Sequence, residues 1–100
     1  MAFGLKRSEL KNWQEAVLAG KIAIITHFWL DDRFPGCTSV TKVGCADLEK
    51  LISWGKKYNL KQEWIDHDPK YPHFDLFAPI QLEILEAEGK QDQIERFNLN

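Results

Sequence analysis

The most apolar run of the chain, Ile22–Trp29, predicts a β-strand, because it is rich in β-branched and aromatic residues and is too short for a helix. Alternate positions are largely apolar on both of its faces. That pattern is typical of a central strand covered on both sides rather than of an edge strand. Charged side chains follow at once, at Asp31, Asp32 and Arg33.

Apolar residues recur at helical spacing in four places, near residues 9–19, 46–58, 79–88 and 91–97, and we expect a helix in each. Ser8 is a suitable N-cap for the first helix, and Gly20 can end it. Asn59 can take the left-handed conformation after the second helix. Pro79 suits the first position of the third helix.

Two further segments predict strands. Residues 62–65 read as a short strand, and the β-branched run Thr38–Val43 predicts a third strand or an extended arm. The order strand, long connection, helix, strand is that of a small α/β domain whose sheet is mostly parallel, with a right-handed crossover. One hundred residues are enough for one hydrophobic core, so we expect a single domain over residues 1–100.

The composition is that of an ordinary globular protein, with 44% hydrophobic and 28% charged residues. A net charge of −2 argues against a general nucleic-acid binder, which needs a basic surface. No apolar run is long enough to span a membrane, and no signal-peptide pattern begins the chain. We therefore expect a cytoplasmic protein in which Cys37 and Cys45 are reduced.

The three histidines each have carboxylates close by in the sequence. His27 lies near the end of the first predicted strand, whereas His67 and His73 follow the second. The carboxyl ends of parallel strands open onto one edge of a sheet, so these groups are expected to converge there. The converging set is His27, Asp31, Asp32, Asp66, His67, His73 and Asp75.

Converging imidazoles and carboxylates suit either a divalent metal ion or general acid–base catalysis. The candidate metal ligands are His27, His73 and Asp75. Asp31 or Asp32 would hold metal or water beside His27, and Arg33 would stabilise an anion. No motif in the sequence names a reaction, so the question of an enzyme stays open.

Three functions remain compatible with this pattern. The first is a module that binds a small molecule or another protein through this edge of the sheet. The second is a metal-dependent hydrolase acting on a phosphate-containing substrate. The third is a nucleic-acid accessory protein that uses Trp54 with Lys56, Lys57 and Lys61, the most basic local run.

Each candidate residue also has a purely structural interpretation. His27 is typical of a buried histidine hydrogen-bonded to a neighbour. Asp47 or Asp75 can cap a helix, and residues 66–69 can form a polar loop. Cys45 is typical of a small buried thiol.

The four tryptophans divide in the same way. Trp13 has the helical spacing of a core residue, whereas Trp54 lies off the main apolar face of its helix and is a candidate for the surface. Trp29 and Trp64 are assigned to ligand binding beside His73 and Asp75.

Three short motifs resemble a bacterial family catalogued as domain of unknown function 4031. They are the helical stretch Asp47–Leu51, the Leu60-x-x-x-Trp64 that follows it, and the triplet His73–Asp75, within a similarity that spans about residues 22–89. The resemblance implies no established activity. It does imply that His73 and Asp75 are better candidates than His67 for the functional site.

Overall fold

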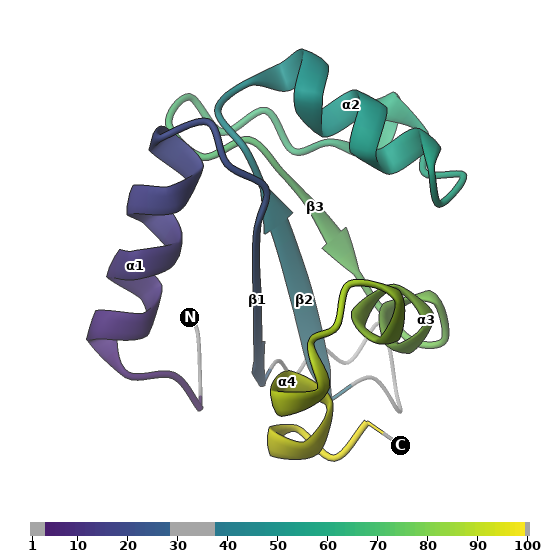
Figure 1. Cartoon of the computed structure of the whole chain (residues 1–100). Helices are drawn as coiled ribbons and strands as arrows, with labels where there is room; N and C mark the ends of the chain where they lie inside the picture. The colour runs from purple at the N-terminus through teal and green to yellow at the C-terminus, as the bar shows by residue number, and fades with distance from the viewer. Residues whose placement is uncertain (1–3, 29–37, 100) are drawn as a thin grey trace.

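The computed structural model describes residues 4–28 and 38–99. Within these residues, three strands form one antiparallel sheet in the order β1-β2-β3. The elements are α1 (Arg7–Leu18), β1 (Ala23–Phe28), β2 (Ser39–Gly44), α2 (Leu48–Lys56), the 3-10 helix η1 (Gln62–Trp64), β3 (His73–Leu76), α3 (Ile80–Ala87) and α4 (Gln91–Arg96). Figure 1 shows α2 across the end of the sheet where β1 begins, and α4 at the opposite end.

The prediction of a mostly parallel sheet is therefore wrong. The segment Thr38–Val43 does form a strand, but that strand is β2, which is central and antiparallel to both neighbours. β1 is an edge strand in the described sheet, contrary to the prediction from its apolar faces. Helices cover both of its faces, with α1 on one and α4 on the other, and this does not require a strand at its outer edge.

The predicted strand at residues 62–65 is also wrong. Gln62 and Glu63 are adjacent polar residues, which breaks the alternation that a strand needs, and this segment forms the 3-10 turn η1. The third strand is His73–Leu76 instead. There Phe74 and Leu76 point into the core, while His73 and Asp75 point to the other face of the sheet.

The four predicted helices form, with ends that follow local capping rules. α1 begins at Arg7, so Ser8 lies inside the helix, and the side chain of Glu9 accepts the Lys6 N–H at 3.1 Å. Asp47 is the N-cap of α2 and accepts the Lys50 N–H at 3.2 Å. Asn59 has the predicted left-handed backbone, with φ of 61°.

The core lies on both faces of the sheet. Trp13 and Val17 of α1 pack against Ala23 and Ile25 on one face. The larger cluster lies on the other face, where α2 and α3 cover the sheet; it comprises Val43, Cys45, Leu51, Trp54, Leu60, Ile65, Phe74, Leu76 and Ile84. Cys45 is a free, fully buried thiol, as its structural interpretation predicted.

A buried polar network joins the sheet to the last two helices. The hydroxyls of Thr26 on β1 and Thr41 on β2 lie 2.7 Å apart. Gln81 of α3 donates to Thr41 Oγ1 at 3.0 Å, and Gln93 accepts from Thr26 Oγ1 at 2.7 Å.

None of the helices in the described part of the chain has the length and apolar character of a membrane span.

Candidate metal site

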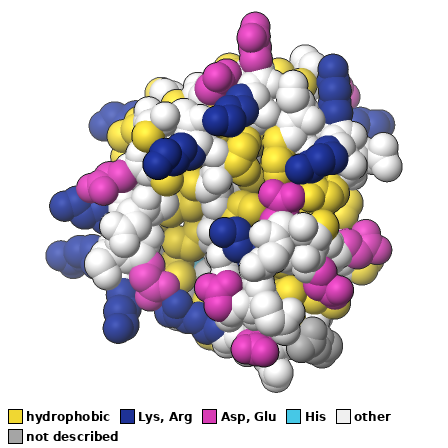
Figure 2. All heavy atoms as spheres, in the orientation of Figure 1, with side chains coloured by type: hydrophobic (Ala, Val, Ile, Leu, Met, Phe, Trp, Pro, Cys, Tyr) yellow, Lys and Arg dark blue, Asp and Glu magenta, His cyan; other side chains and the backbone are white. Residues whose placement is uncertain are grey.

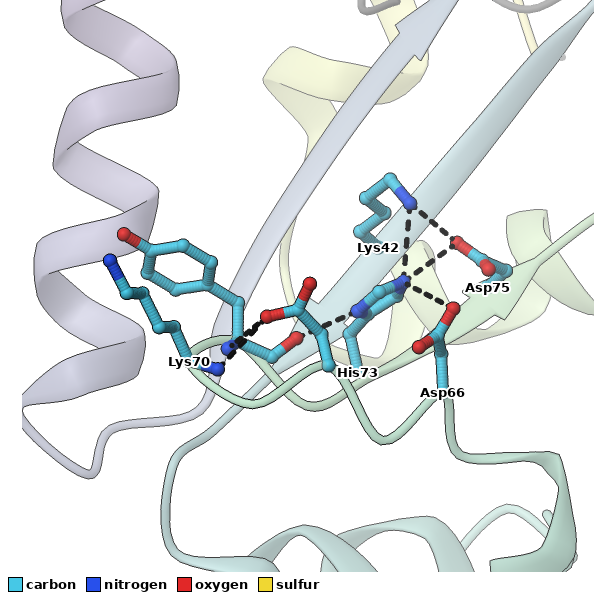
Figure 3. Close-up of polar contacts among 7 residues, drawn as sticks. Lys42, Asp66, Lys70, His73 and Asp75 are labelled. Atoms are coloured by element: carbon cyan, nitrogen blue, oxygen red, sulfur yellow. Dashed lines mark hydrogen bonds and ion pairs between the residues drawn. The ribbon is translucent and has the colours of Figure 1, made fainter.

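The pairing of β2 with β3 places three polar side chains on one face of the sheet. Lys42 is directly opposite Asp75, and Gly44 is opposite His73, so the three side chains point the same way. Lys42 Nζ donates to Asp75 Oδ1 at 3.0 Å and to His73 Nε2 at 3.2 Å. Figure 3 shows the His73 ring between these groups.

The loop before β3 fixes the orientation of the His73 ring. Its Nδ1 donates to the carbonyl oxygen of Tyr71 at 2.8 Å. Asp68 holds this loop, because its Oδ1 accepts the backbone N–H groups of Lys70 and Tyr71, each at 2.9 Å. With the Nδ1 proton used in this way, the lone pair of a neutral imidazole lies on Nε2, which faces the carboxylates.

Asp66 completes the cluster from a neighbouring segment. Its backbone exchanges two hydrogen bonds with His73, at 2.8 and 3.1 Å, so it forms an isolated antiparallel bridge beside β3. Asp66 Oδ2 lies 3.9 Å from His73 Nε2, and Asp75 Oδ1 lies 3.5 Å from the same nitrogen. One ligand atom from each of the three residues lies within 4.8 Å of the other two.

The charges of the cluster stabilise one another. Burial alone would lower the pKa of His73, but the neighbouring Asp75 carboxylate and the hydrogen bond to the Tyr71 carbonyl raise it. Burial alone would raise the pKa of Asp75, but the neighbouring His73 ring and the hydrogen bond from Lys42 lower it. Asp75 is therefore a carboxylate at neutral pH, ready to accept from a cation.

Two of the three spacings between these atoms are close to those around a small divalent ion, and the third lies within 4.8 Å. Ligands at about 2.1 Å from a tetrahedral ion lie roughly 3.4 Å apart, close to the 3.5 and 3.9 Å found between His73 Nε2 and the two carboxylates. The Nδ1–H bond to a backbone carbonyl is the contact that commonly orients a metal-bound histidine. Three protein ligands would leave a position open for water or another molecule. The ammonium group of Lys42 now lies beside the same ligand atoms, so it would have to move away.

The structure brings together His73 and Asp75 of the predicted ligands but places His27 elsewhere. His27 pairs with Val40, four residues along β2 from Gly44 and two strands from β3. Those offsets correspond to about 13 Å along the strands and about 10 Å across them, too far for His27 and His73 to share one ion. The predicted convergence relied on a parallel sheet; in the antiparallel sheet His73 begins β3 at the end opposite His27.

His27 is a buried residue, as its structural interpretation indicated. It is 4% exposed, and its Nδ1 donates to the Phe28 carbonyl at 2.8 Å. Its Nε2 has no hydrogen-bond partner among the described residues. The residues predicted to act with it, Asp31, Asp32 and Arg33, lie outside the described residues, and so does Trp29.

Two members of the cluster were absent from the predicted ligand set. The sequence predicts that Asp66 converges with His73 but assigns it no role, and nothing in the sequence singles out Lys42. The alternation of residues 38–43 gives the face of the strand on which Lys42 lies. Its position opposite Asp75 requires the strand pairing, which local sequence does not contain.

The stacking surface predicted at Trp54 is wrong. Trp54 is only 7% exposed, and its indole N–H donates to Glu88 at 2.9 Å. Lys57 pairs with the same carboxylate, at 3.4 Å. Trp64 is 55% exposed, and its assignment to binding stays a prediction. His67 lies on the surface outside the cluster.

One relative found among curated proteins is described as "Uncharacterized protein YneQ" of Bacillus subtilis (strain 168). It is 54% identical to this chain over 99 residues, which cover 99% of the chain and 100% of the relative. No family model matches the chain, so the resemblance to domain of unknown function 4031 stays a prediction. No solved structure matches either.

Proposed function

We propose that this chain, which belongs to the family of Bacillus subtilis YneQ, is a ligand-binding module built around a divalent metal ion. Asp66, His73 and Asp75 are the protein ligands. The ion's open coordination position takes the ligand. This proposal keeps the predicted binding role but moves it from the carboxyl ends of the strands to one face of β2 and β3.

The orientation of the His73 ring is the observation that carries the proposal. A surface ion pair needs no defined imidazole tautomer, whereas a metal ligand does. The Nδ1 contact to the Tyr71 carbonyl directs Nε2 at two carboxylates. One nitrogen and two carboxylate oxygens suit Zn²⁺ or Mn²⁺ better than Mg²⁺, which prefers oxygen ligands and water.

Calorimetric titration of untagged, chelator-treated protein with Zn²⁺, Mn²⁺ and Mg²⁺ tests the proposal. We expect one Zn²⁺ or Mn²⁺ per chain and a loss of affinity of about 100-fold or more in His73→Ala, since a direct ligand should matter at least as much as the outer-shell groups that support one. His67→Ala is the matched control, because His67 is an exposed histidine outside the cluster. Wild-type protein that binds none of these ions, or His73→Ala that binds as tightly, would refute the proposal.

Metal-dependent hydrolysis of a phosphate ester is a second candidate, favoured by Lys42. Its ammonium group lies 3.2 Å from His73 Nε2 and 3.0 Å from Asp75 Oδ1, so near a bound ion it would attract an anionic substrate. The test is metal-dependent release of nitrophenol from p-nitrophenyl phosphate, compared between wild type and Lys42→Ala. Metal-loaded protein that releases no nitrophenol above the level of the free ion would remove this candidate and leave the binding role intact.

A further inference from the structure

An apolar groove of about 300 Å³ runs along the outer edge of β3, beside the cluster of Asp66, His73 and Asp75. Leu60, Trp64, Phe77 and Ile80 are among its walls, and Asp75 belongs to both the groove and the cluster. Trp64 is one of the most exposed large hydrophobic side chains among the described residues, at 55%. An apolar surface of this kind next to a polar cluster is typical of a small-molecule site.

The backbone of β3 adds polar groups at the edge of the groove. The N–H and C=O of His73 point away from β2, because both bond to Asp66. In an antiparallel ladder alternate residues point the same way, so the N–H and C=O of Asp75 also face outward, beside the groove. A ligand lying along this edge would contact the cluster of Asp66, His73 and Asp75, the backbone N–H and C=O of Asp75, and the apolar wall of the groove.

The charges near the groove favour an anionic ligand. Lys61 Nζ lies 5.8 Å from the centre of the Trp64 ring, and Lys42 lies at the cluster.

Figure 2 shows hydrophobic side chains in the middle of the face seen in Figure 1, with charged groups around them, but no histidine is visible there. The groove at β3 is an apolar surface that adjoins the cluster, because Asp75 belongs to both.

We propose that the groove is the subsite for an aromatic ring whose metal-binding acid group lies at Asp66, His73 and Asp75. The ligand class is an aromatic acid with an anionic oxygen head, such as a carboxylate or hydroxamate. The ring stacks on Trp64 and contacts Leu60 and Ile80. This inference rests on the proposed metal site, since the head of the ligand binds the ion.

A series of hydroxamates with one head group tests the inference. Acetohydroxamate, benzohydroxamate and 3-phenylpropionohydroxamate are titrated into Zn²⁺-loaded protein, and metal retention is checked by mass spectrometry. We expect at least one aromatic member to bind at least tenfold more tightly than acetohydroxamate. Trp64→Ala should abolish that preference and leave the affinities for Zn²⁺ and acetohydroxamate unchanged, whereas Trp64→Phe should keep part of it.

Leu18→Ala is the matched control, because Leu18 on α1 is also 55% exposed and does not line the groove. Its preference for aromatic members should equal that of the wild type. If Zn²⁺ binds but all three hydroxamates have equal affinity, or if Trp64→Ala keeps the preference, the aromatic subsite is refuted while the metal site stands. If no ion binds, the metal site itself fails and the subsite falls with it.

Discussion

Replacing Lys42 with methionine should raise the affinity of the cluster for Zn²⁺, because the lysine competes with the ion. Its Nζ donates to Asp75 Oδ1 at 3.0 Å and to His73 Nε2 at 3.2 Å, and both acceptors are metal ligands in the proposal. The ion therefore binds only after these contacts break. Methionine has a similar length and no charge, so it keeps much of the packing and removes the competition.

The structure gives the size of the effect. The Lys42 and Asp75 side chains are 30% and 35% exposed, and a partly exposed ion pair is worth up to about 1 kcal/mol. After release, the ammonium still repels a divalent ion; at an assumed separation of roughly 7 Å in water and physiological salt that repulsion is about 0.5 kcal/mol. Together these terms predict an affinity up to about tenfold higher in Lys42→Met.

Competition with a chromophoric chelator at neutral pH measures the change. Lys70→Met is the control, because Lys70 lies in the nearby loop and its contact to Asp68 is made by its backbone N–H. Its affinity should equal that of the wild type. Unchanged or weaker binding in Lys42→Met would show that the lysine does not compete with the ion, and would refute the proposed ligand positions.

Three other changes test the packing and the buried groups. Gly55→Ala should cost about 1–2 kcal/mol of unfolding free energy despite better helix propensity, because its Cβ would lie 2.7 Å from Phe74 Cζ. Burial lowers the pKa of His27, so the neutral ring stabilises the fold above about pH 6.5, and this stabilisation is lost as the pH falls below about 6.5. In urea denaturation at roughly pH 7.5 and pH 5, His27→Gln should therefore lose less stability on acidification than the wild type. Burial and the Glu88 carboxylate raise the pKa of Tyr58 to about 12, so Glu88→Ala should lower it towards about 10 in an ultraviolet titration.

Each of these predictions has a control on the same element or beside it. Ser53→Ala, at an exposed position of α2, should be neutral or stabilising, and a stabilised Gly55→Ala would contradict the packing argument. Equal acid sensitivity of His27→Gln and the wild type would contradict the role given to burial. Glu86→Ala, at an exposed position of α3, should leave the Tyr58 titration unchanged; an unchanged titration in Glu88→Ala would contradict the contact.

Local sequence predicts the helices well because their signals are local. The apolar spacing and the caps lie within each helix or next to it, as with Asp47 before α2 and Asn59 after it. The sheet depends on pairing between distant segments. The apolar faces of β1 predict that both faces are covered, and they do not show whether a strand pairs with each of its edges.

The candidate site was predictable to the same limited extent. His73 and Asp75 were predicted as ligands, and both lie in the cluster, because residues two apart on a strand share a face whatever the strand pairs with. Lys42 and Asp66 enter through the register of β2 and through the bridge beside β3. His27 was grouped with them through an assumed parallel topology, and it leaves the group when the topology changes.

The buried network of Thr26, Thr41, Gln81 and Gln93 has a consequence for how the family varies. Each member satisfies a polar atom of another, so valine at position 26 would leave Gln93 Oε1 without its hydroxyl donor. Valine at position 41 would leave Gln81 Nε2 with Ser39 Oγ as its remaining acceptor. Replacing both members of a hydrogen-bonded pair with apolar residues of similar shape costs less than replacing one of them alone. Among members of the family, these four positions should therefore covary, and chimaeras that combine α3 and α4 of one member with the sheet of another should fold only when the set is kept whole.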